Sequence, residues 1–350
     1  MKRSVTYIVL LAVVAAVMLY LLFRQPHPER SKDGTLVIFN WEDYLDKGII
    51  ADFEKETGIA VTVVEYQTMD EELSRLQEDP GAFDLIISNE STIDFLQHAK
   101  LIREFDRSQL SGVELITPRF AHRMPWAVPY LWGTTGFMVD TRQVPSDIES
   151  VEALWDPKYR GKTRLLDDVR EAVAPILLKG GYSFNTDDPV QIADAERHAL
   201  SLRDNGISFG DTFGNVAKVA DGTLWIAQTY NGDYLYKARG RSEFRFFLPR
   251  EGFAVMVEYF VLPKASKNQD AAHRFVSFCL RPEIAARNSN TYFYANAVKG
   301  SEAFLRPELK DNAVMFPAES TLKRGTEYRD VGDAYAAYQR IFNAMKPTAR

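Results

Sequence analysis

Short apolar runs alternate with amphipathic stretches along most of the chain. The runs at 35–39, 60–65 and 84–87 have the length and the β-branched content of buried strands. Helical spacing of apolar residues follows each run, and we expect helices ending at Thr57 and spanning 69–77 and 92–98. Gly58 supplies a residue that can close the first helix in the left-handed conformation. Strands that alternate with helices at this spacing predict a parallel sheet in a doubly wound α/β lobe.

A second α/β pattern of the same kind begins near Thr163. Its expected helices are 170–179, 189–203 and 215–221, and its expected strands are 163–166, 224–228, 244–247 and 254–262. Another amphipathic helix is expected over 269–280. A chain of 350 residues is long enough to bury two cores of this size. The pattern therefore predicts two α/β lobes.

The N-terminus carries an export signal. Lys2 and Arg3 precede an uninterrupted apolar run from Thr6 to Phe23. The run approaches the length of a membrane span, and no small-x-small cleavage site follows it. We expect residues 1–24 to form an uncleaved signal anchor or a cleaved signal peptide, favouring the anchor, and 25–34 to form a linker. The only cysteine is Cys279, so lipidation of an N-terminal cysteine and an intrachain disulfide are both excluded.

Charge and motif content narrow the classes of function. The formal net charge is −6 at pH 7, which argues against nucleic-acid binding and permits a cationic ligand. No glycine-rich phosphate loop follows the first strands, and the five histidines lack the spacing of metal ligands. We therefore expect no cofactor, no metal and no enzymatic activity. The alternative that Asp168, Glu171 and Glu258 supply the acid/base pair of a glycoside hydrolase stays open.

Eight short motifs occur in a specific order between Thr35 and Lys346, and together they resemble the periplasmic spermidine/putrescine-binding proteins of ABC transporters, within the bacterial extracellular solute-binding proteins. The motifs are Asn40-Trp-x-x-Tyr44, Phe83-Asp-Leu-Ile-Ile87, Pro129-Tyr-Leu-Trp-Gly133, Leu154-Trp-Asp-Pro-x-Tyr-x-Gly161, Asp167-Asp-x-Arg-Glu171, Asn231-Gly232, Pro249-x-Glu-Gly252 and Asp330-Val-Gly332.

The resemblance implies a type II two-lobed periplasmic binding protein fold with the ligand cleft between the lobes. It places the crossings between lobes at 137–140, at 262–264 and near Asn312. Lobe 1 then comprises 35–137 and 265–312, and lobe 2 comprises 138–264 and 313–350. It also implies a monomeric periplasmic receptor that delivers a polyamine to a membrane ABC permease, and an uncleaved N-terminal segment would tether this receptor to the inner membrane. An alternative partner is a membrane signalling receptor, which would make the protein a polyamine sensor.

The matched residues suit a polyamine because such a ligand is a flexible methylene chain with ammonium groups at intervals. Carboxylates accept charge-assisted hydrogen bonds from ammonium groups, and aromatic faces cover the methylenes. Asp168 and Glu171 lie three residues apart at the start of an expected helix, although Asp168 could simply cap that helix. Glu258 interrupts an apolar strand, where burial of an acid is costly unless a cation meets it.

The resemblance assigns the remaining binding positions. Aromatic and acidic candidates follow the first strand and occur late in each lobe, and smaller polar or apolar candidates stand where relatives can have aromatic residues. The complete set of ligand-binding candidates is Trp41, Asp43, Tyr44, Asn89, Ser91, Asp168, Glu171, Tyr230, Asp233, Met256, Glu258 and Tyr294. Asp233 matches an acidic contact of putrescine-preferring relatives, although Asn-Gly-Asp is also a common turn. The preferred polyamine stays open.

Overall fold

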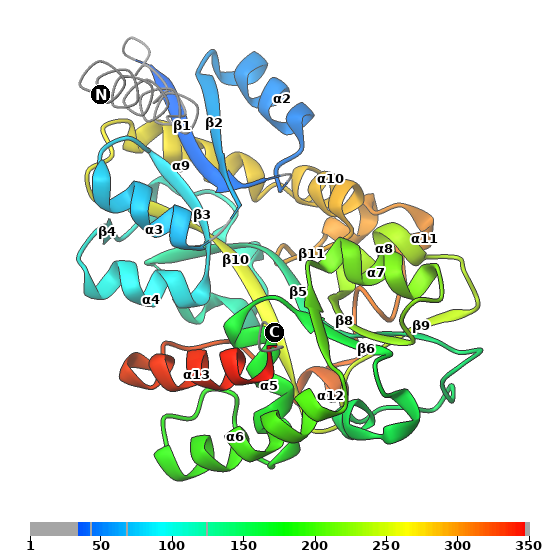
Figure 1. Ribbon diagram of the computed structural model, residues 1–350. Helices are drawn as coiled ribbons and strands as arrows, with labels where there is room; N and C mark the ends of the chain where they lie inside the picture. Colours follow the sequence, from blue (N-terminus) through cyan, green and yellow to red (C-terminus); the bar gives the residue numbers. More distant parts are fainter. Residues whose placement is uncertain (1–33, 43, 68, 124, 347–350) are drawn as a thin grey trace, which may run out of the picture.

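The computed structural model describes residues 34–42, 44–67, 69–123 and 125–346 (Figure 1). The expected export segment and nearly all of the expected linker lie outside these ranges, and so does Asp43. Within the described ranges, no helix combines the length and the apolar character needed to cross a membrane. The expected signal anchor is therefore not tested.

Lobe 1 is built around three parallel strands in the order β2-β1-β3. Helices connect the strands, as the alternating pattern predicts. Gly58 ends the first of these helices with a φ of 71°, in the left-handed region. The elements are β1 (Thr35–Trp41), α2 (Lys47–Thr57), β2 (Ala60–Tyr66), α3 (Met69–Glu78), β3 (Leu85–Asn89) and α4 (Glu90–His98).

Lobe 2 repeats this arrangement, with β6 between β7 and β8 in a parallel sheet. A fourth strand, β9, pairs antiparallel with β5. The elements are β6 (Thr163–Leu166), α5 (Val169–Lys179), α6 (Pro189–Asp204), β7 (Ser208–Gly210), α7 (Thr212–Ala220), β8 (Ile226–Tyr230), α8 (Asn231–Ala238) and β9 (Phe244–Phe247).

Two long antiparallel strands, β5 (Ala127–Asp140) and β10 (Phe253–Pro263), run between the lobes (Figure 1). Strand β5 pairs with β10 up to Thr134 and with β8 from Thr135 onward. The two α/β units therefore share one continuous strand path, and the expected two-lobed fold is confirmed.

The rest of the chain packs around these sheets. Helix α9 covers the lobe 1 sheet together with α2, and the ring of Phe53 lies 5.0 Å from that of Phe275. The remaining elements are β4 (Ile102–Arg103), α9 (Gln269–Cys279), α10 (Pro282–Tyr292), β11 (Ala295–Asn296), α11 (Pro307–Lys310), α12 (Glu319–Leu322), β12 (Gly325–Thr326), α13 (Tyr335–Met345) and 3-10 turns at 107–109, 113–115, 118–123, 151–155, 157–159, 301–304 and 332–334.

Some element boundaries differ from the expected ones in ways that matter for the site. Strand β1 continues through Trp41 and β3 through Asn89, so these two side chains lie on strands and not on loops. Residues 231–238 form helix α8, although the Asn-Gly-Asp sequence at its start is typical of a turn. Asn231 fixes this helix start, because its side chain accepts from the N–H of Thr134 and donates to the carbonyl of Val314.

Candidate functional site

Glu258 lies on β10 opposite Asn89 of β3 and beside a β-bulge in β5. Val257 pairs with Trp132 and Tyr259 pairs with Pro129, so two residues of β5 lie opposite the single residue Glu258. The bulged strand is therefore β5, and Glu258 keeps the regular alternation of β10. The indole Nε1 of Trp41 donates a hydrogen bond of 3.1 Å to Oε2 of Glu258. Trp41 and Glu258, 217 residues apart in the sequence, are therefore neighbours.

Tyr294 lies between the lobes, and two glycines make room for its ring. A Cβ atom on Gly133 would lie 2.8 Å from the ring of Tyr294, and one on Gly232 would lie 2.6 Å from it. Both distances are too short for any other residue type at these positions without a shift of the ring. The ring of Tyr44 lies 5.6 Å from that of Tyr294. Two of the sequence motifs thus provide space for one aromatic side chain.

The carboxyl groups of Asp168 and Glu171 lie at the N-terminus of α5. Oδ1 of Asp168 accepts hydrogen bonds from the backbone N–H groups of Arg170 and Glu171, at 2.8 and 2.9 Å. The capping role is therefore correct, and it uses only one of the two oxygens of Asp168. Oε1 of Glu171 accepts from the hydroxyl of Thr135 at 3.0 Å, and its Oε2 is buried without a hydrogen-bond partner. An incoming donor could satisfy that oxygen.

Tyr230 and Asp233 reach the site from the β8–α8 junction. Tyr230 is the last residue of β8, and Asp233 lies in the first turn of α8. Oδ2 of Asp233 accepts a hydrogen bond of 2.8 Å from the hydroxyl of Thr212. Burial, followed by the negative charges of Glu171 and Asp168, raises the pKa of Tyr230 well above its usual value. Tyr230 is thus close enough to the carboxyls at α5 to respond to their charge.

The four acidic candidates that the structure describes, Asp168, Glu171, Asp233 and Glu258, hold their protons more tightly than exposed carboxyls do. Burial raises the pKa of Glu171 to about 8 and that of Asp233 to about 6. Burial also raises the pKa of Asp168 and of Glu258, the latter well above its usual value. Among the described residues no cation is ion-paired with these carboxyls, and a positively charged ligand would favour their ionised form.

The exposure of the candidates indicates a solvent-reaching junction between the lobes. Asp168 is exposed although burial raises its pKa, which fits a side chain on the wall of a cleft. Six other candidates are half-buried and so also reach solvent, namely Trp41, Tyr44, Asn89, Tyr230, Met256 and Glu258. Burial raises the pKa of Tyr44, and the charges of Asp233 and Glu258 raise it further. The structure therefore brings candidates from both lobes together.

Three candidates remain, of which one lies on a strand and two have side chains outside the described residues. Asn89 pairs with Glu258 across β3 and β10, and its Oδ1 accepts from the N–H of Thr92 at the start of α4. Asp43 lies outside the described residues, and so does the side chain of Ser91. Their expected contacts with the ligand stay predictions.

Three further residues belong to the site and were not among the candidates. Tyr328 lies close enough to Glu171 for that charge to raise its pKa further, after burial. Glu90 and Glu72 are buried carboxyls whose charges raise the pKa of Glu258, after burial. The sequence signal for Glu72 is its position four residues before Leu76, because this helical spacing puts it on the apolar face of α3. Glu90 directly follows a buried strand, which was its only signal.

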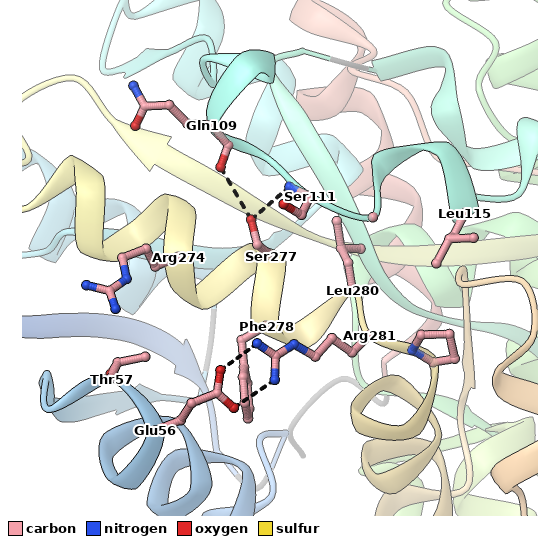
Figure 2. Close-up of a pocket in the computed structure, with 12 residues that line it drawn as sticks. Glu56, Thr57, Gln109, Ser111, Leu115, Arg274, Ser277, Phe278, Leu280 and Arg281 are labelled. Carbon is pink, nitrogen blue, oxygen red and sulfur yellow. Dashed lines mark hydrogen bonds and ion pairs between the residues drawn. The ribbon is translucent and has the colours of Figure 1, made fainter.

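A separate pocket of about 430 Å³ lies on lobe 1 between α2, α9 and the 109–115 loop (Figure 2). Its guanidinium group from Arg281 already forms a two-pronged ion pair with Glu56, at 2.7 and 2.6 Å. None of the candidate residues lines this pocket. In the described residues, no three acidic, histidine or cysteine side chains are grouped as metal ligands. The junction between the lobes is therefore the candidate site.

Comparisons with known proteins agree with this fold. The spermidine/putrescine-binding periplasmic protein of Salmonella typhimurium is 29% identical over 324 residues, covering 90% of this chain and 92% of that protein. The putrescine-binding periplasmic protein PotF of Escherichia coli is 28% identical over 315 residues, covering 82% and 84%.

A solved structure also matches closely. The spermidine/putrescine ABC transporter substrate-binding protein PotD from Streptococcus pneumoniae superposes with a TM-score of 0.81, at 26% identity over 89% of this chain and 98% of that chain. A model of the bacterial extracellular solute-binding proteins matches residues 48–317. Since this match spans most of the sequence, the chain belongs to the bacterial extracellular solute-binding protein family.

Proposed function

We propose that this protein is a periplasmic polyamine receptor that binds putrescine or spermidine between its lobes and delivers it to a membrane ABC permease. Its relatives are named for these ligands and for such transporters. They do not support the alternatives of a sensor docked on a signalling receptor or a glycoside hydrolase. Binding and release of the unchanged ligand require no catalytic group, so the protein has no enzymatic role in this function.

The observation that carries the proposal is the group of four carboxyls with which no cation is ion-paired among the described residues. Asp168, Glu171, Asp233 and Glu258 come from both sides of the junction. Several like-charged groups held close together repel one another, and a ligand with separated ammonium groups relieves that repulsion. Each charge-assisted hydrogen bond contributes about 1.5–3 kcal/mol.

Aromatic side chains supply the other half of the recognition. Trp41, Tyr44, Tyr230 and Tyr294 lie among the carboxyls, and their faces would cover the methylene groups of the ligand. An ammonium group over an aromatic face adds roughly 0.5–2 kcal/mol. Met256 contributes a further apolar surface that is half-buried. The N-terminal apolar run supports export, and as an uncleaved anchor it would hold this monomeric receptor beside its permease.

Calorimetric titration of the purified protein tests the proposal. We expect saturable binding of putrescine or spermidine and no binding of a neutral diol of equal length, because only a charged ligand supplies the cations that pair with these carboxyls. Glu258→Gln keeps an acceptor for Trp41 and removes the charge, so we expect affinity to fall about 10- to 100-fold. Equal affinity for charged and neutral ligands would contradict the proposal.

A further inference from the structure

Glu90 connects three elements from the two sides of the junction. It is the first residue of α4, and its side chain is 2% exposed. Oε2 accepts a hydrogen bond from the backbone N–H of Val257 in β10, and Oε1 accepts from the N–H of Tyr328, both at 3.2 Å. Val257 precedes Glu258, and the ring of Tyr328 packs in the lobe 2 core beside Phe184. One carboxyl group therefore holds backbone on each side of the site.

The charges that face Glu90 are mostly negative. Burial is the main cause that raises the pKa of Glu90 to about 8, and the charge of Glu327 contributes to this increase. Glu258 on β10 and Glu171 on α5 respond in turn to the charge of Glu90, and Glu72 on α3 acts on Glu258. The N-terminus of α4 opposes these effects, since helix N-termini favour negative charge.

Cationic groups near this cluster are turned to other partners. Arg170 lies 4.9 Å from the centroid of the Tyr328 ring, and its guanidinium donates to the carbonyls of Arg329 and Phe184. The imidazole of His122 lies 3.3 Å from the carboxyl of Glu327. No cation therefore contacts Glu90 directly among the described residues.

The two hydrogen bonds that Glu90 accepts fit its ionised carboxylate better than its protonated carboxyl. An ionised carboxylate accepts hydrogen bonds on both oxygens, whereas a protonated carboxyl places an O–H on one of them. Protonation of Glu90 removes its negative charge, so the hydrogen bonds from the N–H groups of Val257 and Tyr328 would become weaker. A cation bound beside Glu258 and Glu171 favours the ionised state through Coulomb attraction.

We propose that Glu90 is a positioning residue for the cationic ligand, which fastens α4 to β10 and to the 325–334 segment when its carboxyl ionises. This inference rests on the proposed function, because the ligand supplies the charge that shifts Glu90 to its ionised state. Ligand binding then releases a proton from Glu90 and orders the backbone beside Glu258 and at Tyr328. Binding and the positioning of the site are thereby coupled.

The surroundings of α4 provide a matched control. Residues of α4, α6, α13 and the 325–334 segment line a groove of about 1710 Å³. Asp94 lies one turn after Glu90 on α4, and its Oδ2 accepts from the backbone N–H of Asp330 at 3.4 Å. Asp94 thus bridges the same two walls as Glu90 does, but its side chain is half-buried and faces the groove. Asp94→Gln would lengthen the side chain, so Asp94→Asn is the suitable comparison.

The decisive experiment is calorimetric titration of putrescine, at about pH 7, in two buffers with different ionisation enthalpies. The difference in heat gives the number of protons released per ligand bound. We expect the wild-type protein and Asp94→Asn to release the same number, and Glu90→Gln to release fewer, by up to about one proton. We also expect the affinity of Glu90→Gln to rise less steeply between about pH 6 and pH 8.5.

Equal proton release and equal pH slopes of affinity in Glu90→Gln and the wild-type protein would overturn the inference. An equal decrease in proton release in Asp94→Asn and Glu90→Gln would also overturn it. If putrescine binds and Glu90→Gln behaves as the wild-type protein does, only this inference is wrong. Absence of binding of every polyamine would sink the proposed function instead.

A measurement on the unaltered protein covers the case in which Glu90→Gln does not fold. The carboxyl carbon of Glu90, labelled with ¹³C and followed by nuclear magnetic resonance, should titrate at about pH 8 without ligand and at a lower pH with putrescine bound. A titration of Glu90 that is unchanged by putrescine would also overturn the inference.

Discussion

Asp168 performs two tasks with one side chain. Its Oδ1 caps α5 through two backbone N–H groups, while the charge of the carboxyl adds to the proposed ligand site. An N-cap residue contributes about 1 kcal/mol to helix stability. Substitutions that keep the cap and remove the charge can therefore separate the two tasks.

We predict that Asp168→Asn retains the melting temperature of the wild-type protein to within a few degrees, because the amide oxygen can still cap α5. The affinity for putrescine should fall about 10- to 100-fold, since a charged hydrogen-bond partner is lost. Thermal unfolding and calorimetric titration check these two results. Asp168→Ala is the comparison, and it should lose the affinity and also about 1 kcal/mol of stability. Unchanged affinity in both variants would remove Asp168 from the site.

At the level of elements, the site depends on close approach between the β8–α8 junction, β5 and Tyr294, which lies two residues after the end of α10. Gly133 on β5 and Gly232 on α8 both face the ring of Tyr294, and no Cβ fits between them and that ring. Asn231 adds the hydrogen bonds that fix α8 against β5 and against Val314. The position of Tyr294 is therefore set by small residues on its neighbours.

We predict that Gly232→Ala weakens putrescine binding roughly 5- to 100-fold, which corresponds to about 1–3 kcal/mol of overpacking. The new methyl group would lie 2.6 Å from the Tyr294 ring and force that ring to shift. Gly214→Ala in α7 is the control, because the nearest atom there is Oδ2 of the exposed Asp211, which is not the oxygen that caps the helix. Calorimetric titration of both variants gives the comparison. Equal affinities would show that the Tyr294 ring does not contact the ligand.

The sequence allowed the type and order of most elements to be predicted, because each element carries its own periodicity. It could not give the last residues of β1 and β3, since Trp41 and Asn89 join their strands through pairing with Tyr66 and Glu258. Helix α8 was missed for the same reason, because Asn-Gly-Asp locally favours a turn and only long-range hydrogen bonds from Asn231 fix the helix. The expected limits of the two lobes stay predictions.

The candidate site was predictable where acids interrupt apolar patterns or match motifs, as at Glu258 and Asp168. The role of Tyr328 depends on where the 325–334 segment crosses the junction, which no local pattern reveals. Glu90 contacts Val257 and Tyr328, which are 167 and 238 residues away in the sequence. Contacts of this range arise from the pairing of β3 with β10 and cannot be deduced from a single sequence.

At the scale of the whole molecule, buried carboxyls make the stability of the unliganded protein depend on pH. Burial raises the pKa of Glu72, Glu90 and Glu171 to about 8, whereas an unfolded glutamate has a pKa of about 4.3. Between these values the folded state binds more protons than the unfolded state. The contribution of each group to stability is therefore complete below about pH 4.3 and is lost as pH rises to about 8.

Glu72 allows this effect to be measured without ligand, because it is fully buried on α3. Burial raises its pKa, although the hydroxyls of Ser88, Tyr66 and Thr92 lower it in part. We predict that Glu72→Gln melts at nearly the wild-type temperature at about pH 5 and several degrees higher at about pH 8.5, because glutamine stays neutral where Glu72 must ionise. Thermal unfolding across this pH range, without ligand, measures the difference. Glu71→Gln on the same helix, where the carboxyl pairs with Arg75 near solvent, should show no increase with pH. A constant difference between Glu72→Gln and the wild-type protein would mean that Glu72 is already ionised in the folded state, and the raised pKa values across this acidic junction would then lose their basis in burial.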